Sequence, residues 1–492
     1  MTQVENRATG ITLIGLGPGD PKYLTLEALA WLKQIKVLYL RTSQHPTVAH
    51  LPEHLELISF DDLYEKHEGF EEVYEEIIDR MLSLGKVSGG ITYAVPGHPF
   101  VAEATCPEIF RRAKIEDIPV RVIEGLSFLG PTFKALALDP FPDLVLADAL
   151  SMGISQTPQT PPSSPVLIAQ IYSRLVASDV KLTLMTTYPD DHPVRLVHGA
   201  GTDKELVEDL PLYAIDHSEH LGLLSALFVP PLSPYTSFES FQEIIAKLRA
   251  PDGCPWDREQ THESLRPFLL EETYETLDAL DRQDMRDLKE ELGDLLLQIL
   301  LHAQIANEEG DFNIHHVLDG IGSKLVRRHP HVFADKKVSG VSGVLHNWEE
   351  IKAEERKDNG DEAKKGLLDG VPKALPALTQ AGEIIKRTRR VGFDYLHNKA
   401  DPAYLIEQIN QFGTAEEKDK FLEDLLLGFS ALAYKHEMDA ESLLREALAR
   451  FREQFGIMEA SAIKRGESLV NLSKERKEGL WSQAGKAMRK EE

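Results

Sequence analysis

Cysteine, long apolar runs and signal-peptide features are scarce in this sequence. Its two cysteines, Cys106 and Cys254, lie far apart in a chain of 492 residues, so no disulfide framework is indicated. No apolar run approaches the roughly 18 residues of a membrane-spanning helix. The first residues, MTQVENRATG, lack the apolar segment of a signal peptide. We therefore expect a soluble, cytoplasmic protein that does not bind a membrane.

Basic charge is also scarce. Lysine and arginine number 54 against 80 aspartates and glutamates, which gives a formal net charge of −26 at pH 7. Nucleic acids and anionic membrane surfaces attract basic patches, so we expect neither as a partner. This acidity does not exclude a triphosphate substrate, because metal ions and a local group of Lys and Arg can supply positive charge.

The length suggests two or three domains. Residues 11–40 read as strand, glycine turn, helix and strand, which is typical of an α/β unit with a parallel sheet. Strand-like alternation stops at the proline-rich segment VPPLSPYTS (Val229–Ser237), and helical patterning follows it. We predict a multidomain protein, with an α/β domain over 1–232 and all-α domains over 233–375 and 376–492.

Two acidic patterns lie on successive leucine-rich helical segments of the all-α region. In the first segment, Glu271 and Glu275 share a face and Glu272 lies about 100° round. In the second, Glu291 and Asp294 are three residues apart. Burying unpaired carboxylates along a packed helix face is too costly, so the patterns indicate a bound cation. Oxygen donors without cysteine favour Mg²⁺ or Mn²⁺.

Two other interpretations account for acids of this kind. Most glutamate-rich helices are simply solvated on their outer face, and the first pattern taken alone favours that interpretation. A di-iron bundle would need Glu-x-x-His on its helices, and the nearby instance, Glu259 to His262, precedes the first segment. The second acidic pattern, after one short turn, favours the divalent metal site.

The two patterns, with CPWDREQTH before them and KLVRRHPHVF after them, resemble the MazG family of all-α nucleoside triphosphate pyrophosphohydrolases. The resemblance spans Tyr235 to Lys486. It implies hydrolysis of a nucleoside triphosphate to the monophosphate and pyrophosphate, with Mg²⁺ or Mn²⁺ as cofactor. The implied metal ligands are Glu271, Glu272, Glu275, Glu291 and Asp294.

Basic residues downstream complete the expected site. Lys324, Arg327 and Arg328 are spaced by three and four near a helix end, where basic residues are also common without any ligand. Beside a carboxylate–metal site, we interpret them as catalytic and substrate-binding residues that clamp the phosphates. By resemblance, the substrate would also be approached by Trp256, Trp348 and Lys352. We expect Glu272, off the main ligand face, to accept the proton of the attacking water.

The α/β part opens with GLGPGDPKYLT, whose glycines lack the third member of a dinucleotide fingerprint. Together with GGITYAVPGHPFVAEAT and VRVIEGLSFL, this opening resembles the tetrapyrrole (corrin/porphyrin) methylase family. The resemblance implies two α/β subdomains and S-adenosylmethionine as methyl donor. The implied cofactor-binding residues are Gly97, His98, Pro99, Phe100 and Ser127.

Two positions depart from the methylase pattern. His98 stands where the family's donor loop usually has aspartate, and Glu124 stands where a later turn usually has proline. Both departures put methyl transfer in question, and the acceptor is not readable from the residues.

The last part of the helical region echoes the part before it. In the echo, Glu407, Gln408 and Gln411 take the places of the first acidic pattern, and Phe421 and Asp424 those of the second. We predict a degenerate second copy that keeps its leucines and has lost its ligands. Its role would be packing, because a two-helix unit cannot cover its own apolar face.

We predict a Mg²⁺-dependent nucleoside triphosphate pyrophosphohydrolase joined to a methyltransferase-like domain. Two alternatives stay open: the protein is primarily a methyltransferase, or it is a regulatory protein that senses nucleotide or S-adenosylmethionine. Whether the protein forms a homodimer stays open as well.

Overall fold

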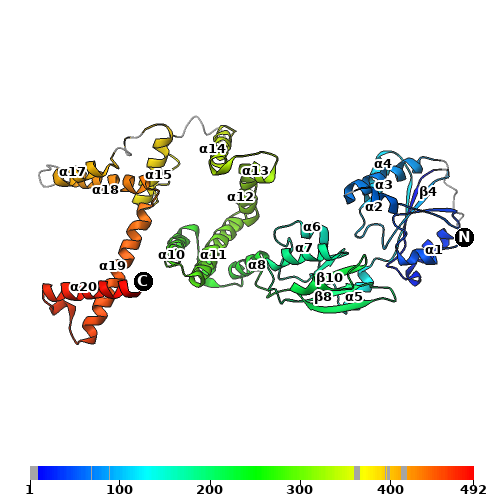
Figure 1. Ribbon diagram of the computed structural model, residues 1–492, viewed down its shortest axis with the longest axis horizontal. Helices are drawn as coiled ribbons and strands as arrows, with labels where there is room; N and C mark the ends of the chain where they lie inside the picture. Colours follow the sequence, from blue (N-terminus) through cyan, green and yellow to red (C-terminus); the bar gives the residue numbers. More distant parts are fainter. Residues whose placement is uncertain are drawn as a thin grey trace. The chain divides into compact units, whose positions relative to one another are not determined.

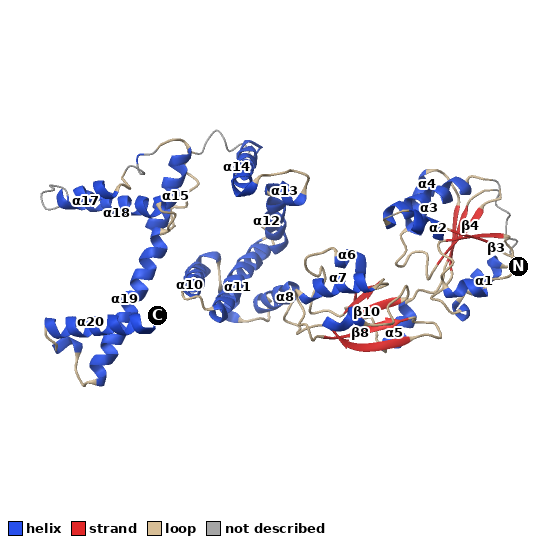
Figure 2. Cartoon of the chain, viewed as in Figure 1, coloured by secondary structure: helices blue, strands red, loops and turns tan. Residues whose placement is uncertain are grey.

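The computed structural model describes residues 9–67, 69–87, 89–358, 366–393, 395, 399–411 and 418–491. It divides into two compact units, Met1–Glu259 and Gln260–Glu492. Within the described residues, every strand lies in the first unit and the second unit is helical (Figure 2). The predicted succession of an α/β part and a helical part is confirmed.

The first sheet is parallel throughout, with strand order β3-β2-β4-β1-β5. Its strands are β1 (Ile11–Gly15), β2 (Val37–Leu40), β3 (Glu56–Ser59), β4 (Ile91–Val95) and β5 (Val120–Ile123). The intervening helices are η1 (Pro21–Tyr23), α1 (Leu26–Leu32), η2 (Pro46–His50), α2 (Asp61–Lys66), α3 (Phe70–Gly85) and α4 (Thr105–Ile115). Because β1 lies between β4 and β5, the loops that follow these three strands meet at one edge of the sheet.

Both faces of the first sheet are covered by helices (Figure 1). Along β1, Ile11 and Leu13 belong to the core beneath α3 and α4, whereas Ile14 belongs to the core beneath α1. This alternation follows from the two-residue period of a strand. A strand buried on both faces needs a continuous apolar run, which is how β1 reads in the sequence.

The second sheet is mixed, with strand order β6-β7-β10-β8-β9. Only β6 and β7 pair in parallel. Its strands are β6 (Val145–Asp148), β7 (Val166–Ala169), β8 (Pro193–His198), β9 (Leu206–Pro211) and β10 (Ser225–Val229). One face packs on α5 (Leu129–Leu136), and the other on α6 (Ala149–Gly153), α7 (Arg174–Met185) and η3 (Leu212–His217). The two sheets are the two predicted α/β subdomains.

Two helices close the first unit. After β10, residues 230–237 form neither helix nor strand. The Ser237 side chain then accepts a hydrogen bond from the Ser240 N–H and begins α8 (Phe238–Arg249), and α9 (Pro255–Glu259) follows.

The second unit begins with helices that carry the predicted site. These are α10 (His262–Asp281), α11 (Met285–Glu309), α12 (Ile314–Arg328), α13 (Pro330–Phe333) and α14 (Gly340–Asp358). Polar caps set their boundaries. Thr261 starts α10 with a capping box, and the Asp284 side chain accepts two backbone N–H bonds at the start of α11. Gly310 ends α11 in the left-handed conformation that favours glycine.

The remaining described elements of the second unit are α15 (Ala377–Arg390), α17 (Pro402–Gln411), α18 (Lys418–Lys435), α19 (Ala440–Lys464), η6 (Leu469–Asn471) and α20 (Lys474–Glu491). Their descent from a degenerate second copy stays a prediction. Across the described residues, we find no helix with both the length and the apolar character needed to cross a membrane.

Candidate active site

Helices α10 and α11 form an antiparallel hairpin. At one end, Nδ1 of His262, the first residue of α10, lies 2.8 Å from Nδ1 of His302 in the second half of α11. At the other end, Glu275 of α10 meets Glu291 near the start of α11. The antiparallel arrangement therefore brings together the two acidic patterns that are separate in the sequence.

Three carboxylates gather in this hairpin. One oxygen from each of Glu272, Glu275 and Glu291 lies within 4.8 Å of the others. Partial burial raises the pKa of the Glu272 carboxyl, and the negative charges of Asp294, Glu275 and Glu291 raise it further. The pKa of Glu291 is raised in the same way by desolvation and by Glu275, Asp287 and Asp294. The group concentrates negative charge, which a cation would offset.

The rotation of α10 decides which of its acids join the group. Glu271 lies on an exposed part of the helix and is not one of the three gathered acids. Glu272, which helical spacing alone places off the main face, is one of them, because α11 packs along its side of α10. Asp294 acts on the group through its charge. The metal-ligand roles of all five acids stay predictions.

Two of the three predicted basic residues lie together at the end of α12. Nη2 of Arg327 lies 2.6 Å from Oε1 of Glu355, a residue of α14. Nη2 of Arg328 lies 2.5 Å from the other carboxylate oxygen, Oε2. Hydrogen bonds from the two arginines lower the pKa of Glu355 to about 2, chiefly through Arg328. Lys324, one helical turn earlier on α12, is exposed.

Trp348 of α14 brings two predicted residues together. The guanidinium carbon of Arg328 lies 5.7 Å from the centre of the Trp348 ring, and Nζ of Lys352 lies 5.0 Å from it. Both distances suit cation–π attraction. Trp256 lies on α9, in the first unit, and its substrate role stays a prediction.

Sequence reasoning assigned no role to Glu355. Trp348, Lys352 and Glu355 are spaced by four and three, so they share one face of α14. This spacing is the sequence feature that could have pointed to Glu355. It does not identify the two arginines of α12 as its partners, because contacts between two helices do not follow from spacing along one of them.

A second polar cluster lies further along the hairpin. The ring planes of His262 and His302 are nearly parallel, with 6° between them. Their Nδ1 atoms are 2.8 Å apart, so one of the two carries a proton and donates it to the other. Burial lowers the pKa of His302, and its neighbour His262 lowers it further. Gln298 lies one turn before His302 and is buried; within the described chain, its Oε1 accepts no hydrogen bond.

In the first unit, three loops meet at glycines. Gly97 N–H donates to the Gly17 carbonyl over 2.8 Å, and Gly17 N–H donates to the Gly97 carbonyl over 3.1 Å. A Cβ on Gly15 would lie 2.5 Å from the Gly97 oxygen and 2.6 Å from the Gly125 nitrogen. Only glycine therefore fits at Gly15. Gly97 has a φ of +67°, and nothing lies within 4 Å of a Cβ built on it, so its outer side is open.

The remaining predicted donor-binding residues lie on the same loops. Nδ1 of His98 accepts a hydrogen bond of 3.0 Å from the Phe100 N–H. An aspartate side chain can close a turn in the same way, which explains how histidine is accommodated here. After β5, the Ser127 hydroxyl oxygen accepts from the Leu129 N–H over 3.2 Å. Pro99 lies between His98 and Phe100 in the first of these loops.

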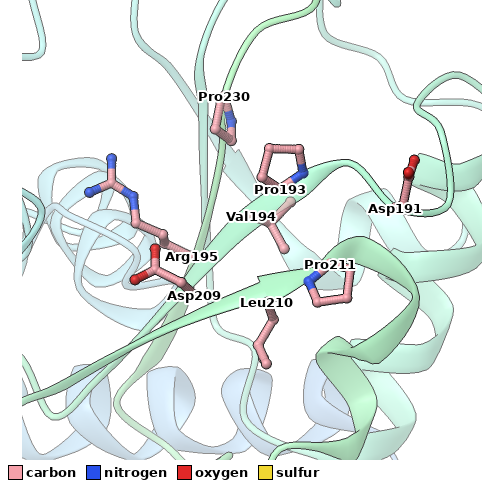
Figure 3. Close-up of a pocket in the computed structure, with 8 residues that line it drawn as sticks. All are labelled: Asp191, Pro193, Val194, Arg195, Asp209, Leu210, Pro211 and Pro230. Carbon is pink, nitrogen blue, oxygen red and sulfur yellow. The ribbon is translucent and has the colours of Figure 1, made fainter.

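A pocket of about 320 Å³ opens on the second sheet (Figure 3). It is lined by Asp191, Pro193, Val194, Arg195, Asp209, Leu210, Pro211 and Pro230. No predicted site residue lies among them. Arg195 and Asp209 are partners in the register of β8 and β9, and the Arg195 side chain donates a hydrogen bond of 3.2 Å to the Leu136 carbonyl and lies over the Phe228 ring.

Two family models match the chain. The model of the tetrapyrrole (corrin/porphyrin) methylases matches residues 10–216, and the model of the MazG nucleotide pyrophosphohydrolase domain matches residues 260–333. The second match contains the acid group of α10 and α11 and the basic end of α12.

Relatives match either nearly the whole chain or only a part of it. An uncharacterized protein of Bacillus subtilis, YabN, is 39% identical over 98% of this chain and 99% of its own length. A nucleoside triphosphate pyrophosphohydrolase of Escherichia coli is 41% identical over 49% of this chain and 94% of its own length. The nucleoside triphosphate pyrophosphohydrolase/pyrophosphatase MazG of Thermotoga maritima is 39% identical over 50% and 95%.

Proposed function

The chain belongs to the family in which a tetrapyrrole methylase domain is joined to a MazG domain, and from that membership we propose that it is a metal-dependent nucleoside triphosphate pyrophosphohydrolase. The products would be a nucleoside monophosphate and pyrophosphate. Two relatives that match about half of the chain carry the name of this activity.

The observation that carries the proposal is the group formed by Glu272, Glu275 and Glu291, with Asp294 beside it. Its donors are carboxylate oxygens from two helices, which suit a hard divalent cation. Their separation of at most 4.8 Å fits ligands around a common ion. Bound Mg²⁺ or Mn²⁺ would act as a Lewis acid toward the phosphate and its attacking water.

The residues of the chain supply the other functions of the site. We assign Glu272 as the acceptor of the proton that the attacking water loses, because it lies in the acid group where a bound metal would activate that water. Lys324, Arg327 and Arg328 are assigned to the negative charge of the leaving pyrophosphate. Trp348 and Lys352 are assigned to substrate binding, since both accompany Arg328.

Product analysis across the eight common ribo- and deoxyribonucleoside triphosphates tests this function. With Mg²⁺, the full chain should release pyrophosphate and the matching monophosphate in equal amounts. A chelator should stop the release, and added Mg²⁺ should restore it. Release of orthophosphate, or no turnover of any of the eight, would contradict the proposal. The same panel measures base and sugar preference.

A second candidate function rests on the glycine contacts of the first unit. We propose that the loops after β1, β4 and β5 bind S-adenosylmethionine, because ligands of α/β sheets bind at the carboxyl edge where such loops meet. The glycines of these loops leave their backbone groups uncovered by side chains, and the outer side of Gly97 is open.

Calorimetry on the full chain with S-adenosylmethionine and S-adenosylhomocysteine tests the second function. His98→Asp should keep binding, because both side chains can accept the Phe100 N–H. Gly97→Val should lose it, because valine is strained at a φ of +67° and its side chain would enter the open side. No heat from the folded protein at millimolar ligand would mean that this unit does not bind the donor.

A further inference from the structure

Glu355 engages both arginines of α12 through the same edge of each guanidinium. Nε of Arg327 donates to Oε1 over 2.7 Å, beside the Nη2 contact. Nε of Arg328 donates to Oε2 over 3.1 Å, again beside its Nη2 contact. A guanidinium has five N–H donors in a rigid plane, so fixing the Nε and Nη2 edge also fixes where Nη1 points.

The contacts with Glu355 use Nε and Nη2 of each arginine and leave Nη1 for another partner. Across the part of the chain that the structure describes, neither Nη1 donates to another residue. Arg328 is held on a second side by the Trp348 ring, and its side chain is 14% exposed. Arg327 is 56% exposed. Two adjacent cations would repel each other without an anion between them, so the carboxylate is what keeps the pair together.

We propose that Glu355 is a positioning residue, which holds Arg327 and Arg328 side by side with their Nη1 edges presented to the phosphates of the substrate. The inference rests on the proposed function of the arginines. In this arrangement Glu355 touches neither substrate nor metal. Its contribution is to fix the geometry of two donors that would otherwise lie on flexible side chains, and preorganised donors bind phosphate better than mobile ones.

The chain contains a matched control for this arrangement. On α4, Glu108 binds two adjacent arginines, Arg111 and Arg112, with N–O distances of 2.6 and 2.5 Å. Hydrogen bonds from these arginines also lower the pKa of Glu108 to about 2. The Glu108 cluster lies in the first unit, where Arg112 also contacts Glu75 of α3, and it contains none of the residues assigned to the hydrolase. Glu108→Gln therefore reports the cost of losing such a bridge where no phosphate is expected.

The test compares Glu355→Gln, Glu355→Asp and Glu108→Gln in the full chain. The readouts are the Kd of inorganic pyrophosphate by calorimetry, kcat and KM for a triphosphate, and the Tm. A glutamine can accept from one arginine but presents an amide to the other. We expect Glu355→Gln to raise the pyrophosphate Kd about tenfold and to lower kcat/KM by about tenfold or more, the value of one lost charge-assisted contact.

Glu355→Asp keeps the charge and should lie between the wild type and Glu355→Gln. Glu108→Gln should leave both Kd and kcat/KM within about twofold, although it removes a similar bridge. Equal pyrophosphate affinity in the wild type and Glu355→Gln would overturn the proposal. Tighter binding by Glu355→Gln would overturn it too, because the carboxylate would then be a competitor of phosphate.

The binding measurement separates this inference from the function on which it rests. If the wild type hydrolyses no triphosphate, the proposed hydrolase function fails, and the pyrophosphate Kd values still decide the role of Glu355. If the wild type does not bind pyrophosphate, the arginines are no phosphate site and the inference fails directly.

Discussion

In the hairpin of α10 and α11, called the first hairpin below, carboxylates face one another. In the packed pair of α17 and α18, called the second hairpin below, Asp424 and Glu407 instead face donors from the chain itself. Nζ of Lys399 lies 2.7 Å from Asp424, and the Gln411 amide donates to Glu407 over 3.2 Å. Glu272 and Glu291 instead have raised pKa values, because burial and neighbouring acids disfavour their charged forms.

This difference indicates which of the two hairpins would gain stability by binding a metal cation. Lys399 is nearly buried, with a side chain 10% exposed, and burial alone would lower its pKa. The hydrogen bond and the charge of Asp424, together with Tyr395, outweigh this and raise the pKa, so Lys399 stays charged beside Asp424. A metal ion would gain little there. Among the residues that the structure describes, no lysine or arginine forms an ion pair with Glu272, and binding a cation would relieve the repulsion in its acid group.

The largest expected effect is a difference in pyrophosphate release between variants of the first and the second hairpin. Glu272→Gln should reduce pyrophosphate release on the order of 100-fold or more, because it removes both a proposed metal ligand and the proposed proton acceptor. Asp424→Asn should change it by about twofold at most, since its partner is a lysine of the chain. Steady-state kinetics with circular dichroism as a fold control measures both. Comparable losses in the two variants would erase the distinction between the hairpins.

Metal removal should affect the thermal stability of one hairpin only. Mg²⁺ at 100 times its Kd should stabilise the wild type by about 2.7 kcal/mol, because only the folded state binds it. Thermal unfolding in Mg²⁺ and in chelator measures the shift. The shift should vanish in Glu275→Gln and persist in Asp424→Asn. A shift that survives Glu275→Gln would place the metal elsewhere.

Without metal, the two hairpins should respond to charge removal with opposite signs. Glu291→Gln should raise the Tm of the metal-free protein by a few degrees, because it removes repulsion from a group of acids. Lys399→Met should lower the Tm, because it leaves Asp424 without its cation. The direction of the Tm change for Glu291 follows from its raised pKa. The charged carboxylate destabilises the folded state fully at neutral pH, and this destabilisation fades as the pH falls through the raised pKa. A lower Tm for metal-free Glu291→Gln would mean that its contacts outweigh the repulsion.

The smallest effect is expected at Glu407, which stands in the sequence where Glu271 stands in the first pattern. Glu407 is exposed and accepts one hydrogen bond from Gln411, its neighbour one turn on. Glu407→Gln should change pyrophosphate release by less than about twofold, as exposed polar contacts contribute little. Measuring Glu271→Gln beside it sharpens the comparison. A large loss for Glu407→Gln would show that the second hairpin also carries ligands.

Much of the fold could be predicted from local pattern. The change from strand-like alternation to helical patterning near Val229 identified the α/β part and the helical part. The mixed second sheet could not be predicted, because the position of β10 between β7 and β8 depends on how distant segments pair. At the candidate site, spacing along the chain singled out the acids of α10 and α11 and also Arg327 and Arg328, and their roles stay predictions. Glu355 was not, because its partners are on another helix.

The sequence by itself determined the features that depend on neighbours along the chain. Helical spacing placed Glu291 and Asp294 on one face, and glycine spacing marked the loop after β1. Tertiary structure alone decided which helix faces meet. The packing of α11 brought Glu291 to Glu272 and Glu275 of α10 and left Glu271 outside the group. The parallel sheet brought Gly15, Gly97 and Gly125 into contact across more than a hundred residues of sequence. The physical reason is that spacing along one element follows from backbone geometry, whereas contacts between elements depend on the packing of the whole core.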